Sequence, residues 1–135
     1  MSKGTNAERE LCTELWNKGF ATLRAPGSGS IDRPSPDVVA LKGDVMNYQA
    51  YAFELKASPD GCAYFETEEI DALEEWSERA RAMPLVAVKP DLRAFDDWLI
   101  MSTKSLRNSD GGLSITTQNH KQCSGLEYFG NKVIE

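Results

Sequence analysis

The chain has 135 residues, 41% of them hydrophobic and 27% charged, with a net charge of −6. This length predicts a single domain over 1–135 that can bury about two-thirds of its unfolded surface. The polar N-terminus has no signal-peptide core, and no apolar run approaches the roughly 20 residues of a membrane-spanning helix. Three scattered cysteines and one histidine do not fit a disulfide framework or a structural zinc site. We therefore expect a cytoplasmic protein without a membrane partner.

The first expected element is a helix over 5–18. Leu11 and Leu15 form an apolar stripe at helical spacing. Thr5 and Glu8 have the spacing of a capping box, in which the two residues satisfy free backbone N–H groups at a helix start. A structural role at the helix start is therefore one open interpretation of Glu8.

The next segments predict three strands and a long loop. A short strand covers 20–24, and the Gly, Ser and Pro content of 25–36 is typical of a loop. Two apolar runs, 37–41 and 47–56, then predict a β-hairpin that turns through Lys42-Gly43-Asp44.

The second half of the chain predicts a long amphipathic helix and further strands. The helix covers 65–83, and strands cover 84–89 and 95–102. A short helix or turn is expected over 105–112, and an edge strand over 113–118. The order α-β-β-β-α-β-β predicts an α/β fold with a central mixed β-sheet flanked by helices.

Most of the acidic excess lies in one part of the chain. Residues 61–90 hold 3 basic and 7 acidic side chains, whereas residues 1–60 hold 7 basic and 8 acidic ones. We expect these acids on a solvated helix face. A nucleic-acid partner, which needs basic residues for its phosphates, is therefore not excluded by the net charge.

An acid and a base share one face of the expected strand 47–56. Successive strand side chains point to opposite faces, so Glu54 and Lys56 lie on one side, roughly 6.6 to 6.8 Å apart. If the hairpin closes symmetrically, Asp37 lies beside Glu54 at one end of the sheet. Two converging carboxylates repel unless one is protonated or a cation bridges them, and such oxygen ligands suit Mg²⁺. The alternative is a salt bridge at the strand end beside an ordinary turn aspartate.

These residues also fit a known signature. Pro36-Asp37 followed by Glu54-Leu55-Lys56 resembles the PD-(D/E)xK nuclease motif. The segments KGTNAERELCTELWNKGF, RAPGSGS, PDVVAL and ELK closely resemble, in this order, the archaeal-type Holliday junction resolvases. The similarity is continuous from about Lys3 to Lys56 and looser up to about residue 102. It implies a restriction-endonuclease-like core in a homodimer that cuts four-way junction DNA by Mg²⁺-dependent phosphodiester hydrolysis, with Mn²⁺ able to substitute and no small-molecule cofactor.

The resemblance also implies roles for individual residues. The catalytic set would be Glu8, Ser28, Asp37, Glu54 and Lys56. The metal ligands would be Glu8, Asp37, Glu54 and, through its backbone carbonyl, Leu55. Phosphate contacts near the scissile bond would come from Lys3, Arg9 and Arg24.

Several alternatives stay open at the level of the sequence. Ser30 competes with Ser28 for the role of the loop serine, and the arginines could be ordinary surface residues. Trp16 is expected in the core, Trp76 either there or with Phe65 at the dimer surface. Two rival functions are another PD-(D/E)xK nuclease of the repair or restriction type, and a non-catalytic module that binds junctions.

Overall fold

The computed structural model describes residues 3–25, 33–43 and 46–129. Its first elements are α1 (Lys3–Asn17), β1 (Ala21–Arg24), β2 (Val38–Gly43), β3 (Tyr48–Ala57), β4 (Ala63–Glu66) and α2 (Thr67–Ala80). They are followed by β5 (Met83–Lys89), β6 (Leu99–Ser102), η1 (Thr103–Ser105), β7 (Arg107–Ser109), β8 (Gly112–Ile115), η2 (His120–Gln122) and η3 (Leu126–Tyr128). Within these ranges, no helix is long and apolar enough to cross a membrane.

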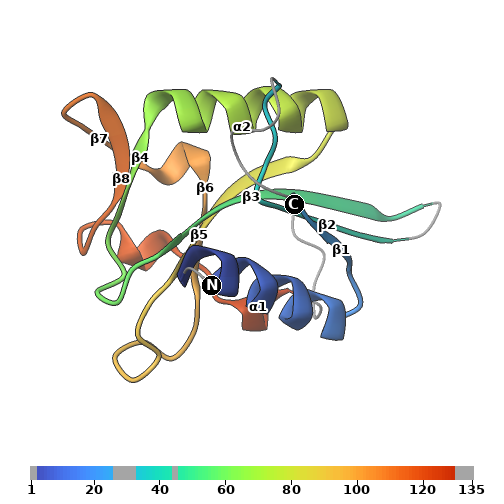
Figure 1. Cartoon of the computed structure of the whole chain (residues 1–135), viewed down its shortest axis with the longest axis horizontal. Helices are drawn as coiled ribbons and strands as arrows, with labels where there is room; N and C mark the ends of the chain where they lie inside the picture. The colour runs from blue at the N-terminus through green and yellow to red at the C-terminus, as the bar shows by residue number, and fades with distance from the viewer. Residues whose placement is uncertain (1–2, 26–32, 44–45, 130–135) are drawn as a thin grey trace.

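Five strands form a mixed sheet in the order β1-β2-β3-β5-β6, with α1 and α2 on its opposite faces (Figure 1). β3 pairs antiparallel with β2 and parallel with β5. A parallel pair needs a crossover connection, which the chain makes through β4 and α2. The expected α/β fold with a central mixed sheet flanked by helices is confirmed.

The strand β3 separates two hydrophobic cores, because its side chains alternate between the faces of the sheet. Its large residues Tyr51, Phe53 and Leu55 belong to the core that also contains the apolar stripe of α1. Ala52 belongs to the core beneath α2. The small residue therefore lies on the same face as the charged residues at the end of the strand.

The second helix begins two residues later than the sequence indicated. Phe65 and Glu66 belong to β4, where they pair with β8. The side chain of Phe65 is fully buried, so its expected place on an exposed dimer surface is wrong. The helix ends at Ala80, and its C-cap residue Arg81 has a left-handed φ of 55°, which turns the chain toward β5.

The strand expected over 95–102 is shorter, because an acidic side chain binds the backbone in front of it. Asp97 accepts hydrogen bonds from the N–H groups of Trp98 (2.7 Å) and Glu127 (3.1 Å). Bonds of this kind offer the backbone an alternative to strand pairing. β6 therefore begins only at Leu99.

Three short strands form a second antiparallel sheet in the order β4-β8-β7. β7 lies where a short helix or turn was expected. The strand expected over 113–118 corresponds to β8, but it pairs on both sides and is the central strand of its sheet, not an edge. β8 is central because β4 pairs with it on one side. The sequence pattern had assigned the end of β4 to the following helix, so this pairing was not expected.

The tryptophans of the two long helices, Trp16 and Trp76, have different environments. Trp16 near the end of α1 is 64% exposed, so its expected place in the core is wrong. Trp76 on α2 is partly buried against the core beneath that helix.

Candidate active site

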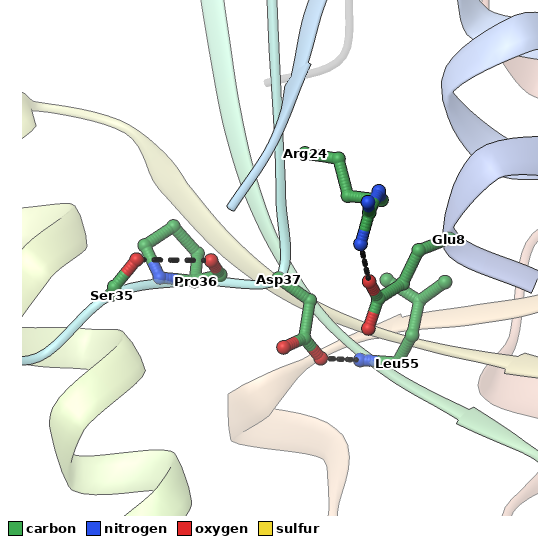
Figure 2. A network of polar contacts seen from close by, with 6 residues as sticks. All are labelled: Glu8, Arg24, Ser35, Pro36, Asp37 and Leu55. Carbon is green, nitrogen blue, oxygen red and sulfur yellow. Dashed lines mark hydrogen bonds and ion pairs between the residues drawn. The ribbon is translucent and has the colours of Figure 1, made fainter. Parts of the chain in front are cut away.

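Asp37 is held by backbone hydrogen bonds at the start of β2. Its N–H donates to the carbonyl of Phe53 (2.8 Å), and its own carbonyl accepts from the N–H of Ala25 (3.0 Å). Its carboxylate accepts a hydrogen bond from the N–H of Leu55 (2.9 Å), as Figure 2 shows. Pro36, which precedes Asp37, is buried. The bonds to the segment after β1 and to β3 therefore fix the position of Asp37.

The carboxyl group of Glu54 lies beside that of Asp37, and the two share a hydrogen bond. Burial, helped by the negative charges of Asp37 and Glu69, raises the pKa of Glu54 to about 8. Burial also raises the pKa of Asp37, although the hydrogen bond from Leu55 acts against this. At neutral pH the pair therefore holds a proton, as expected for two carboxylates that converge in a desolvated site.

Lys56 completes the charged end of β3. Its ammonium group lies 3.3 Å from the carboxylate of Glu69 on α2 and 5.5 Å from the ring centre of Phe65. The ammonium also lowers the pKa of both Asp37 and Glu54, although by less than burial raises it. The base is thus close to the acidic pair but ion-paired with a different residue.

Glu8 reaches the site from α1 and is bound by Arg24. A guanidinium nitrogen of Arg24 lies 3.2 Å from a carboxylate oxygen of Glu8 (Figure 2). Glu8 lies close enough to raise the pKa of Asp37. The helix begins at Lys3, two residues before Thr5, so Thr5 does not cap its start. The expected capping box of Thr5 and Glu8 is therefore wrong, and a role for Glu8 at the site stays a prediction.

The donor chemistry of the site fits a hard divalent cation. Asp37 and Glu54 offer carboxylate oxygens in a half-buried position, and a cation bound there would replace the shared proton and relieve their repulsion. Within the described residues, no group of three or more His, Cys, Asp and Glu side chains is arranged to hold a metal ion. The structure thus brings two of the three expected acidic ligands together, with Glu8 nearby in its ion pair.

The other expected site residues are placed less completely. Arg9 is exposed on α1. Ser28 and Ser30 lie outside the described residues, as does the side chain of Lys3. Leu55 is buried, and its N–H is committed to Asp37. The expected role of its carbonyl stays a prediction.

Among the described residues, Glu69 belongs to this site and was not singled out from the sequence. A signal was available, because Glu66 and Glu69 have the spacing of a capping box. The signal was missed because the helix was expected to start at residue 65, which places Glu66 inside the helix and not at its cap. With the helix starting at Thr67, Glu66 is the cap, and Glu69 lies in the first turn beside Lys56.

The mixed sheet, with a carboxylate pair and a lysine at the ends of two adjacent strands, defines a restriction-endonuclease-like fold. It is similar to the structure of Archaeoglobus fulgidus Hjc, a Holliday junction resolvase from an archaeal hyperthermophile, with a TM-score of 0.81 and 26% identity over 95% of this chain and 100% of that one. A family model described as archaeal Holliday junction resolvase (hjc) matches residues 1–129. The chain belongs to this family, as the sequence motifs indicated.

Relatives known by sequence carry matching names. The crossover junction endodeoxyribonuclease Hjc of Archaeoglobus fulgidus is 39% identical over 88 residues, which are 65% of this chain and 62% of that protein. The protein of the same name from Sulfurisphaera tokodaii is 32% identical over 114 residues, which are 82% of this chain and 73% of that protein.

Proposed function

We propose that this chain is an endodeoxyribonuclease that resolves four-way DNA junctions by metal-dependent phosphodiester hydrolysis. The observation that carries the proposal is the half-buried Asp37–Glu54 pair, with Lys56 close to it at the end of β3. Membership in the resolvase family and the names of the relatives support the junction as substrate.

The proposed cofactor is Mg²⁺, with Mn²⁺ able to replace it. Resolvase nucleases generally depend on a divalent metal. Asp37, Glu54 and the carbonyl of Leu55 would hold the ion, with Glu8 as a further acidic neighbour. When bound, such an ion lowers the pKa of a water molecule and offsets negative charge on the phosphate.

The residues of the chain prepare the site for this reaction. The hydrogen bond from Leu55 N–H keeps the carboxylate of Asp37 directed at Glu54. Glu54 must give up the proton that burial favours before it can serve as an anionic ligand. The ammonium of Lys56 can orient the attacking water or offset charge that develops on the phosphate.

Two arginines are proposed as phosphate contacts beside the site. Arg9 is exposed and follows Glu8 directly in α1. Arg24 keeps further N–H donors besides the one that faces Glu8, because a guanidinium carries five. Such contacts position DNA without reading its bases. The expected contributions of Lys3 and Ser28 remain predictions.

The proposed assembly is a homodimer, and an apolar sheet face supports it. Leu23 on β1 is 72% exposed and lies in register with the half-buried Val39 and with Ala52. On the same face, Tyr48 is 63% exposed. Ala52 is buried beneath α2, so the exposed apolar side chains of this face lie on β1 and at the start of β3, where a second copy could cover them. A two-fold dimer would match a junction with two opposed strands to cut.

The proposal is tested by cleavage of a labelled four-way junction in Mg²⁺, with a linear duplex of the same arms as control. We expect paired nicks in the junction, little cleavage of the duplex, and a loss of at least about 100-fold in Glu54→Gln. Equal cleavage of the duplex would favour a repair or restriction type of nuclease. Tight junction binding without cuts would favour a module that only binds.

A further inference from the structure

Glu69 uses its two carboxylate oxygens for two different partners. One oxygen accepts a hydrogen bond from the backbone N–H of Glu66 (2.9 Å), and the other accepts from the ammonium of Lys56 (3.3 Å). The residue therefore connects the start of α2 to the charged end of β3.

The first of these bonds fixes the carboxylate of Glu69. Glu66 is the N-cap of α2, and the side chains of Glu66 and Glu69 each accept a hydrogen bond from the other residue's backbone in a complete capping box. The N-terminus of a helix also favours a negative charge in its first turn. Glu66 itself is paired with Gly112 of β8. The carboxylate of Glu69 is thus held by a backbone N–H whose residue is itself fixed by strand pairing.

Lys56, in contrast, has a flexible four-carbon side chain that is 37% exposed. Besides Glu69, its ammonium has two attractive neighbours in Asp37 and Glu54, and its charge lowers the pKa of both carboxyl groups. A lysine without Glu69 would therefore be drawn toward the acidic pair. In that position it would compete with a cation for the same oxygens.

We propose that Glu69 is a positioning residue, which holds Lys56 beside the Asp37–Glu54 pair and keeps it from folding across that pair. This inference rests on the proposed hydrolysis, in which Lys56 must face the phosphate. Glu69 acts through Lys56 and touches neither substrate nor metal in this account. The rival explanation is that Glu69 serves only to cap α2.

Two substitutions separate positioning from capping. Glu69→Gln keeps one oxygen that can accept from the N–H of Glu66, puts an NH2 donor in place of the oxygen that faces Lys56, and removes the charge that pairs with Lys56. Glu66→Ala removes the reciprocal side-chain cap but leaves the carboxylate of Glu69 and Lys56 in place. Both variants weaken the start of α2, and only the first affects the lysine directly.

The first readout is single-turnover cleavage of a four-way junction by the full chain in Mg²⁺. We expect Glu69→Gln to be about 10-fold slower, within the range typical of groups that orient a reacting residue, with junction affinity within about twofold of wild type. Glu66→Ala should cleave within about twofold of wild type. In a Lys56→Ala background, Glu69→Gln should have no further effect. Equal losses in Glu66→Ala and Glu69→Gln, or an undiminished effect without Lys56, would overturn the proposal.

The second readout does not depend on activity. A crystal structure of metal-free Glu69→Gln should show the ammonium of Lys56 within hydrogen-bond distance of Asp37 or Glu54. A lysine that stays in its wild-type position would overturn the proposal. If wild type fails to cut junctions, the proposed function fails, and this structure alone then decides whether Glu69 positions Lys56.

Discussion

The two faces of β3 show how one strand serves both folding and chemistry. Toward α1 it presents Tyr51, Phe53 and Leu55, which are almost wholly buried in an apolar core. Toward α2 it presents Ala52, followed by Glu54 and Lys56, which are buried only in part. The bulky face stabilises the strand. On the other face, the small side chain of Ala52 lets α2 pack close to Glu54 and Lys56. The fold thus tolerates a desolvated pair of acids because the opposite face of the same strand is well packed.

The largest effect on this comparison is expected from the bulky face. Phe53 is fully buried, so Phe53→Ala should lower the free energy of unfolding by about 3–5 kcal/mol, through lost burial and a cavity. Urea denaturation followed by circular dichroism measures this. Phe53→Leu is the matched control, with a smaller expected loss. A loss of free energy of unfolding below about 1 kcal/mol in Phe53→Ala, close to what surface substitutions cause, would mean that this face does not stabilise the strand.

The charged face should behave in the opposite way. Since folding raises the pKa of Glu54 to about 8, the stability that this group contributes is present at acid pH and is lost as the pH rises from the ordinary value of 4.5 through about 8. Glu54→Gln removes this loss. In divalent-free buffer at pH 8, its free energy of unfolding, measured by urea denaturation, should therefore exceed that of wild type by a few kcal/mol, since each unit of the pKa shift corresponds to about 1.4 kcal/mol.

The control for this prediction is the pH dependence itself. At pH 4, where Glu54 is protonated in both the folded and the unfolded chain, the variant and wild type should differ little. Parallel stability profiles of the two proteins from pH 4 to pH 8 would contradict the raised pKa.

Asp37 contributes to both folding and the site, since its carboxylate accepts a hydrogen bond from the backbone of β3 and lies beside that of Glu54. Asp37→Ala leaves the N–H of Leu55 without its acceptor, which should cost about 1–3 kcal/mol. Asp37→Asn keeps an acceptor oxygen and should stay closer to wild type in stability, while junction cleavage is lost in both variants. Equal unfolding curves for the two variants would show that the hydrogen bond contributes little.

The smallest effect on folding is expected at the exposed apolar edge. Leu23→Lys changes a side chain that is 72% exposed, so the free energy of unfolding of the monomer should shift by no more than about 0.5 kcal/mol. If the proposed homodimer uses this face, the same change should shift the sedimenting species from dimer to monomer. A dimer that persists in Leu23→Lys would place the interface elsewhere.

The sequence predicted the parts of this structure that follow from local periodicity. The alternation in β3 placed Glu54 and Lys56 on one face, and the expected hairpin placed Asp37 beside Glu54, as the structure shows. The register of β2 and β3 follows from which residues must be buried, so a short pattern was sufficient.

The parts that failed depend on contacts between distant segments. β4 was merged into the second helix, because Phe65 also fits a helical stripe and only the pairing with β8 makes it a strand residue. The ion pair between Lys56 and Glu69 was missed for the same reason, since it requires the correct start of α2. The ion pair between Glu8 and Arg24 joins α1 to β1 and leaves no trace in either segment alone.

The central claim is that Asp37 and Glu54 form a cation site whose shared proton must leave when a metal binds. Calorimetric titration of Mn²⁺ into the metal-free protein at pH 7, in two buffers of different ionisation enthalpy, measures this directly. We expect binding that releases close to one proton per site in wild type, and no comparable binding in Glu54→Gln. Binding without proton release, or equal binding in the variant, would contradict the account of the site.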